Sequence, residues 1–154
     1  MSRTPSYFLL AVATVLSAYN PASAQSTDPA TQLYVNFVGV NFAHVGGPKR
    51  QPFAVVIIVD GNGQPVNGAL VVGDWSGCFK QLNDSAVTET VCHTGEDGTV
   101  NCTDGEAIIW ANKSYSCWGK GKGCSFTFTI TSVSKDGMTY VPVEGQTTAS
   151  IPCN

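Results

Sequence analysis

The chain has 154 residues, with 8 Lys and Arg against 11 Asp and Glu, and a formal net charge of -3. This acidic balance and the lack of a dense basic cluster exclude nucleic acid as a partner on electrostatic grounds. Only 12% of the residues are charged and 16 are Gly, a composition typical of extracellular proteins built from short strands and turns.

Residues 1–24 have the pattern of a secretory signal peptide. Arg3 precedes an apolar run over residues 7–16, and Ala22-Ser23-Ala24 follows as a cleavage site. The run is about half as long as a membrane span requires, so no span is expected. We therefore predict a secreted chain, extracellular or periplasmic, with an N-terminal leader and first strand at 25–45 and one domain at 46–154.

After the signal, the chain alternates between strand and turn signals. Residues 32–45 predict a first strand or a bent pair. The run 53–60 is apolar on both faces and predicts a central strand. The turn Asp60-Gly61-Asn62-Gly63 then predicts that the strand at 69–75 returns beside it. A loop is expected at 76–85, and further strands are expected at 86–93, 99–103, 106–111, 125–133, 138–143 and 147–151.

The clearest alternation of apolar and polar residues is at 125–133, where Phe126, Phe128 and Ile130 share one face. No window has the apolar period of a helix. Short strands between turn signals predict two antiparallel sheets packed face to face, and a closed barrel fits the same pattern. The residues predicted to form the core are Val55, Ile57, Val59, Val71, Trp75, Ile108, Phe126, Phe128, Ile130 and Tyr140.

All six cysteines lie after the predicted cleavage site. In an oxidising compartment an even number of cysteines indicates disulfides. Cys92 and Cys102 flank a turn at Asp97-Gly98. We therefore expect a bridge between the two strands of one hairpin.

The other four cysteines allow several pairings. Cys117 and Cys124 flank a Gly-rich loop and are predicted to pair, which leaves Cys78 with Cys153. The cysteine spacings lack the close pairs of a zinc site. Neither a metal nor another cofactor is predicted.

Several segments together carry a resemblance to a known family. The sequence contains, in this order, AHVG, VDGNGQPVNGALVVGDWSG, VCHTGEDGTVNC, FTFTITSV and Tyr140-Val141-Pro142. It resembles an immunoglobulin-like module, of the Big or fibronectin-like kind, found in secreted bacterial proteins and often appended to extracellular peptidases. The resemblance covers residues 43–142. The matching positions are Asp60, Gly63, Pro65, Val66, Gly68, Ala69, Val71, Gly73, Trp75, Ser76 and Gly77, together with Cys92, Gly98 and Cys102.

This resemblance implies an all-β fold, an antiparallel immunoglobulin-like β-sandwich that presents loops rather than chemistry. The chain departs from the family in two places. Acidic residues often follow the HVG segment in the family, whereas Gly47-Pro48-Lys49-Arg50 stands here, so no calcium site is expected at that point. Cys78, Cys117, Cys124 and Cys153 are additional and would staple the sandwich.

The titratable residues do not form a pattern typical of an active site. No serine elbow, HExxH motif or pair of carboxylates frames His44 or His93. Asp74 is the acid expected to be most buried, but one carboxyl group does not make a glycosidase pair. The sequence therefore predicts a secreted, non-catalytic interaction or structural module that binds a protein or polysaccharide at the cell surface.

Two alternative functions stay open. Trp110, Tyr115 and Trp118 crowd one segment, and exposed rings of this kind stack on sugars, as in a carbohydrate-binding module. Packing of the same rings in the core is the competing interpretation. The segment 25–45 is alternatively a strand donor to a neighbouring copy, which would make the chain a subunit of an extracellular filament that assembles by self-association.

Other polar residues give weaker signals. Oxygen ligands suited to calcium occur at Asp60, Asn62, Asp97, Asp104 and Glu106. No bidentate acid follows at the required offset, so plain turns are favoured over a calcium loop. Glycosylation acceptor patterns occur at Asn83, Asn101 and Asn112, and they matter only in a host that glycosylates.

Overall fold

Ten β-strands account for most of the residues that the structure describes. In this computed structural model those residues are 28–118 and 123–153, so the predicted signal peptide lies outside them. The strands are β1 (Gln32–His44), β2 (Lys49–Asp60), β3 (Leu70–Gly77), β4 (Leu82–Val87), β5 (Glu89–Thr94), β6 (Val100–Trp110), β7 (Tyr115–Ser116), β8 (Ser125–Ser134), β9 (Thr139–Tyr140) and β10 (Thr148–Pro152). Over the described ranges, no helix has the length and hydrophobicity to cross a membrane.

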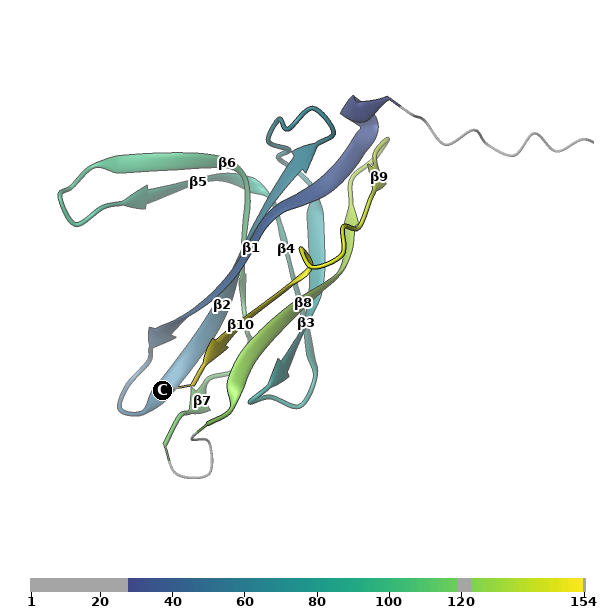
Figure 1. Cartoon of the computed structure of the whole chain (residues 1–154). Helices are drawn as coiled ribbons and strands as arrows, with labels where there is room; N and C mark the ends of the chain where they lie inside the picture. Colours follow the sequence, from purple (N-terminus) through teal and green to yellow (C-terminus); the bar gives the residue numbers. More distant parts are fainter. Residues whose placement is uncertain (1–27, 119–122, 154) are drawn as a thin grey trace, which may run out of the picture.

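The strands form two sheets that face each other (Figure 1). One sheet has the order β5-β6-β2-β1-β9, with β7 paired to β2, and the other has the order β10-β8-β3-β4. Every pairing between these strands is antiparallel except that of β1 with β9. The prediction of an all-β, antiparallel sandwich is confirmed, and β2 is a central strand as expected.

The predicted pairing of the strands around the Gly-Asn-Gly turn is wrong. The turn itself forms, since Asp60 N donates to Gln64 O at 2.8 Å and Val66 N to Ile58 O at 3.0 Å. The chain then leaves the sheet of β2, and β3 pairs with β4 and β8 in the other sheet. Local turn residues determine the reversal of the chain, but burial decides which sheet the next strand joins.

The predicted strand at 86–93 is split between the two sheets. β4 ends at Val87 in one sheet and β5 begins at Glu89 in the other, so part of the predicted loop 76–85 is strand. Thr88 lies between them and is buried. Its hydroxyl donates to Val66 O at 2.6 Å and accepts from Ala69 N at 2.9 Å. Because these backbone groups are buried, the hydroxyl supplies partners that the strands do not.

The core between the sheets contains half of the predicted residues. Val71, Trp75, Phe126, Phe128 and Ile130 are buried as predicted, and Tyr140 packs against this core while half-buried. In β2 and β6, the side chains predicted to face the core face away from it, and their neighbours face the core instead. The inward residues are Ala54, Val56, Ile58 and Ile109, whereas Val55, Ile57, Val59 and Ile108 point outward and are only partly buried. A strand that is apolar on both faces carries no alternation from which its phase can be derived.

The disulfides form one predicted pair and two that differ from the prediction. Cys92–Cys102 is confirmed. The other bridges are Cys78–Cys124 and Cys117–Cys153. β3 and β10 flank β8 on its two sides, which brings the Sγ atoms of Cys78, Cys124 and Cys153 within 4.8 Å of one another.

Sheet pairing therefore decides these two bridges. Cys78 lies across from the start of β8, where its N donates to Ser125 O at 2.8 Å, and so it meets Cys124. Cys117 follows β7 in one sheet and Cys153 follows β10 in the other. The bridge between them links the two sheets.

Candidate functional site

The hairpin of β5 with the first half of β6 projects from the sandwich as an arm (Figure 1). We call residues 89–105 the arm. Every residue from 92 to 102 is exposed, and β5 pairs with no strand other than β6. A two-stranded hairpin is marginally stable on its own in water. The Cys92–Cys102 disulfide joins directly opposed positions, with Cα atoms 3.9 Å apart, and thereby staples the arm.

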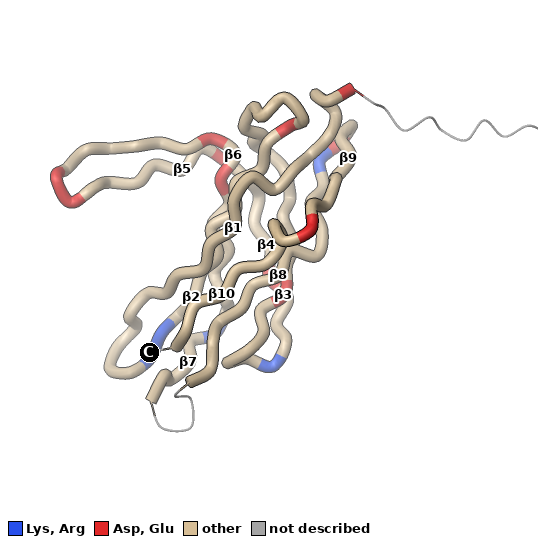
Figure 2. The backbone as a smooth tube through the Cα atoms, in the orientation of Figure 1, with Lys and Arg blue, Asp and Glu red and all other residues tan. Residues whose placement is uncertain are grey.

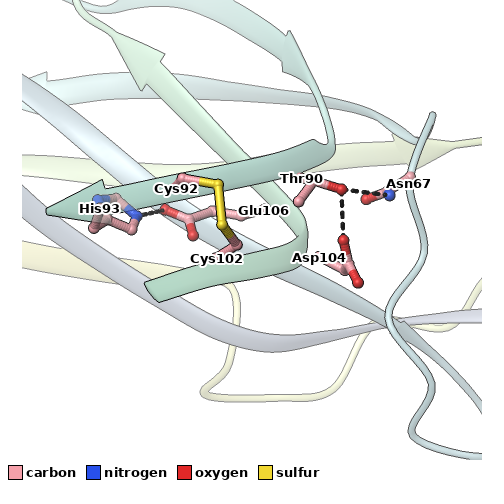
Figure 3. The surroundings of a disulfide bond; sticks show 7 residues. All are labelled: Asn67, Thr90, Cys92, His93, Cys102, Asp104 and Glu106. Carbon is pink, nitrogen blue, oxygen red and sulfur yellow. Dashed lines mark hydrogen bonds and ion pairs between the residues drawn. A yellow bond between two sulfur atoms is a disulfide. The ribbon is translucent and has the colours of Figure 1, made fainter. Parts of the chain in front are cut away.

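The base of the arm is fixed to the sandwich by polar contacts of Asn67 (Figure 3). Its Oδ1 accepts from Gly105 N at 2.6 Å and its Nδ2 donates to Thr90 Oγ1 at 3.3 Å. The Thr90 hydroxyl donates in turn to Asp104. Gly105 has a φ of 71°, and a Cβ at this position would lie 2.6 Å from Ile58 O. Only Gly fits where the chain bends out of the sheet.

A second polar contact joins the arm to the sheet through His93 and Glu106. His93 Nε2 lies 2.9 Å from Glu106 Oε1, and their side chains are 53% and 3% exposed. Glu106, rather than the expected Asp74, is therefore the most buried acid of the described residues. Acid–base chemistry would need a substrate cavity beside this pair. The cavities beside Met138, Tyr115 and Phe53 do not include either residue. The contact joins adjacent strands, so the pair is placed to hold β5 against β6.

In the sheet that includes the arm, the side facing away from the core carries aromatic and aliphatic side chains. Neighbouring outward positions pair Phe37 with Ile57 on β1 and β2, and Phe53 with Trp110 on β2 and β6. Phe37 is 49% exposed and Trp110 is 46% exposed. We call Phe37, Phe53, Val55, Ile108 and Trp110 the aromatic face.

The rings of the aromatic face lie in defined positions. The Phe53 and Trp110 ring centroids are 4.6 Å apart. The Phe37 ring lies over Gly39, where a Cβ would come within 2.8 Å of the ring. Between Phe37 and Phe53 is a shallow cavity of about 200 Å³. No member of the aromatic face is charged, so this surface favours apolar or aromatic contacts over ionic ones.

The predicted ligand-binding residues Trp110, Tyr115 and Trp118 do not form one platform. Trp110 belongs to the aromatic face, and Trp118 is 74% exposed after β7. The Tyr115 ring instead packs against Phe79 and Phe126 of the core, at centroid distances of 5.9 and 6.3 Å. Sequence reasoning missed Phe53, because a residue in an apolar run gives no sign of which side it faces. It also missed Phe37, because alternation puts Phe37 on the side of Leu33 and Val35, whereas the register of β1 shifts between Val35 and Phe37 and turns this ring outward.

Two of the acids considered for calcium, Asp60 and Asp97, serve the turns in which they lie. Asp60 Oδ1 accepts from Asn62 N at 2.8 Å and from Gln64 N at 2.9 Å. Asp97 Oδ1 accepts from Thr99 Oγ1 at 2.7 Å and from Thr99 N at 3.0 Å, and these bonds lower the pKa of Asp97. Hydrogen bonds to the charged form favour ionisation. The turns are stabilised by their own carboxylates.

The remaining singled-out residues lie outside the aromatic face, and of them only Asn101 belongs to the arm. Hydrogen bonds from Asn83 and then Gln81 lower the pKa of Asp74 on the exposed side of β3. His44 is exposed at the end of β1, with its ring 5.7 Å from that of Phe42. The three predicted glycosylation acceptors, Asn83, Asn101 and Asn112, are exposed.

The comparisons with known proteins define no closer class than the fold itself. No family model, no curated protein and no solved structure matches this chain. The fold and the disulfides define an all-β, disulfide-bonded sandwich, and three disulfides are typical of proteins from oxidising or extracellular compartments.

Proposed function

We propose that this protein is a secreted, non-catalytic interaction module of the immunoglobulin-like kind, which binds a protein partner at the cell exterior through its aromatic face. The observation that carries the proposal is the partly exposed, uncharged set of Phe37, Phe53 and Trp110 on one side of the same sheet. Aromatic side chains are enriched in protein interfaces because they bury a large area with little loss of side-chain entropy. The three disulfides support the proposed location.

The carbohydrate-binding alternative has a narrower basis than the sequence implied. Tyr115 packs into the core, so the Phe53–Trp110 pair would have to provide the stacking surface. Two neighbouring aromatic rings on paired strands can stack on a sugar ring, although these two are inclined to each other by 39°. This observation favours testing polysaccharides alongside proteins.

Strand donation by the leader has a structural cost. β1 pairs with β2 from Leu33 to His44, and its residues Leu33 and Val35 are buried. Giving this strand to a neighbour would expose both residues and one edge of β2. Self-association by another surface is compatible with the same sheet.

The function can be tested with labelled mature protein on intact cells of the producing organism and on a panel of insoluble polysaccharides. The double variant Phe37→Ser with Trp110→Ser removes both exposed rings. The control is Val87→Ser, because Val87 is 53% exposed on β4 of the other sheet. We expect saturable binding to cells that falls at least about tenfold in the double variant and is unchanged in the control.

Three outcomes separate the alternatives. Protease treatment of the cells that abolishes binding supports a protein partner. Binding to a purified polysaccharide that depends on Trp110 and survives Phe37→Ser supports the carbohydrate alternative. Equal binding by wild type and double variant contradicts both.

A further inference from the structure

The charged residues of the sandwich are separated along its length. The arm and its junction with the sheet, residues 89–106, contain Glu89, Glu96, Asp97, Asp104 and Glu106 and no Lys or Arg. Figure 2 shows most of the basic residues at the opposite end, where the β1–β2, β3–β4 and β6–β7 connections meet. That end has four bases, Lys49, Arg50, Lys80 and Lys113, against two acids. The acids are Asp74, which accepts from Gln81 at 2.7 Å, and Asp84, which accepts from the backbone of Asn112. The two ends are therefore of opposite sign.

A cavity of about 530 Å³ opens at the basic end. Its lining includes Lys80 and Lys113 together with the apolar or aromatic residues Phe79, Leu82 and Tyr115. The only ion pair among the described residues is His93–Glu106, so neither lysine is neutralised by a carboxylate there. A cavity lined by two lysines and by apolar residues suits a partner that presents acidic side chains on a hairpin or a similarly narrow segment.

The arm is such an element. Its tip is the turn from Gly95 to Thr99, in which Gly95 N donates to Thr99 O at 2.7 Å and Gly98 N to Gly95 O at 3.0 Å. Glu96 and Asp97 are exposed at this tip. The Asp97 carboxylate accepts hydrogen bonds from Thr99. The described residues include no hydrogen-bond partner of the Glu96 side chain, so this side chain can reach beyond the turn. The disulfide and the Asn67 contacts fix the direction of the arm, which reduces the entropy lost when it docks.

We propose that the arm of one copy docks with Glu96 and Asp97 at the Lys80–Lys113 cavity of a second copy. This inference rests on the proposed function as an interaction module and names one of its partners. The two surfaces lie at opposite ends of the molecule, so copies that stack head to tail make a heterologous contact. Repetition of a heterologous contact that does not close into a ring gives an open chain of molecules.

Sedimentation velocity of the mature protein tests this contact at low and at physiological salt. The variant Lys80→Glu with Lys113→Glu reverses the cavity, and Glu96→Lys with Asp97→Asn reverses the tip while keeping a turn-forming residue. The control Glu144→Lys with Asp136→Asn makes the same change in net charge as the tip variant, away from both surfaces. Far-ultraviolet circular dichroism and non-reducing peptide mapping establish that each variant keeps its fold and bridges.

We expect wild type to associate more strongly at low salt, since contacts between exposed charges are screened by ions. Each reversal should weaken association at least about tenfold, and the control should not. Mixing the two reversed variants should restore association, because each then meets a surface of opposite charge. Failure of the mixture to restore association overturns the inference.

Two further results overturn the inference without touching the proposed function. One is a wild-type protein that stays monomeric at low salt while it binds cells. The other is association that the charge reversals leave intact and that Phe37→Ser with Trp110→Ser abolishes, since the copies would then meet through the aromatic face. A wild-type protein that associates in a salt-sensitive way but does not bind cells would instead count against the proposed function alone.

Discussion

The body of the sandwich and the arm are stabilised in different ways. In the body, Trp75, Phe126 and Phe128 are fully buried between two sheets. In the arm no residue from 92 to 102 is buried, and a disulfide with a set of hydrogen bonds takes the place of a core. A hairpin held in this way can present acidic residues in water at a fixed angle. Because the arm has no core of its own, the Cys92–Cys102 cross-link keeps its two strands together.

The largest effect is expected from removing the central side chain of the body. Trp75→Ala should lower the free energy of unfolding by about 3 to 5 kcal/mol, because the Trp75 ring packs 4.8 Å from Phe128 and leaves a large cavity. Denaturant titration followed by circular dichroism measures this. Trp118→Ala is the matched control, since Trp118 is exposed and its loss should cost about 0.5 kcal/mol or less. Equal effects of the two changes would contradict a core centred on Trp75.

The disulfides of the body and of the arm should behave differently when removed. Loss of Cys78–Cys124 by double substitution to Ser releases a separation of 46 residues and should cost about 4 kcal/mol of global stability. Loss of Cys92–Cys102, with a separation of 10 residues, should cost about 1 kcal/mol or less globally, because the arm opens without opening the body.

Hydrogen exchange separates these two effects. Without Cys92–Cys102, the amides of the arm should exchange faster while those of β3 and β8 keep their protection. Uniform loss of protection over both sheets would show that the arm and the body unfold together.

A smaller effect is expected at Thr88, where the chain passes from the body to the arm. Thr88→Val keeps the shape of the side chain but leaves Val66 O and Ala69 N without their buried partner. The expected loss is about 1 to 3 kcal/mol in the free energy of unfolding, measured by thermal and chemical denaturation. Thr88→Ser retains the hydroxyl and should lose less. A Val variant as stable as wild type would show that water replaces the hydroxyl.

The smallest effect is expected at Asp84 on β4 in the body. Burial raises its pKa, and a backbone hydrogen bond from Asn112 offsets this only in part. A carboxyl whose pKa is raised on folding contributes stability below its unfolded pKa and loses that contribution as the pH rises through the folded pKa.

Asp84→Asn should therefore stabilise the protein slightly at about pH 7 and leave it unchanged at about pH 3. The gain should be about 0.5 kcal/mol or less, because the group is partly exposed and screened. Thermal denaturation at the two pH values measures it. A loss of stability at neutral pH would show that the ionised carboxylate is needed by the fold.

Part of the arm and of the fold could be predicted from the sequence because the signals were local. The Asp97-Gly98 turn lies midway between Cys92 and Cys102, and the observed register places these cysteines opposite each other. The alternation at Phe126, Phe128 and Ile130 gave the inward face of β8 correctly. The candidate site was only partly foreseen, since Trp110 was named but its ring partner Phe53 was not.

The sequence by itself determined the all-β class, the stapled hairpin and the lack of a helical period, since these follow from residues that are neighbours along the chain. Only the tertiary structure decided that β3 joins the opposite sheet, that Tyr115 packs inward, and that Cys78 and Cys153 flank Cys124. These features depend on contacts between distant segments. In a run without alternating apolar and polar residues, the surface against which the strand packs decides which side chains face inward.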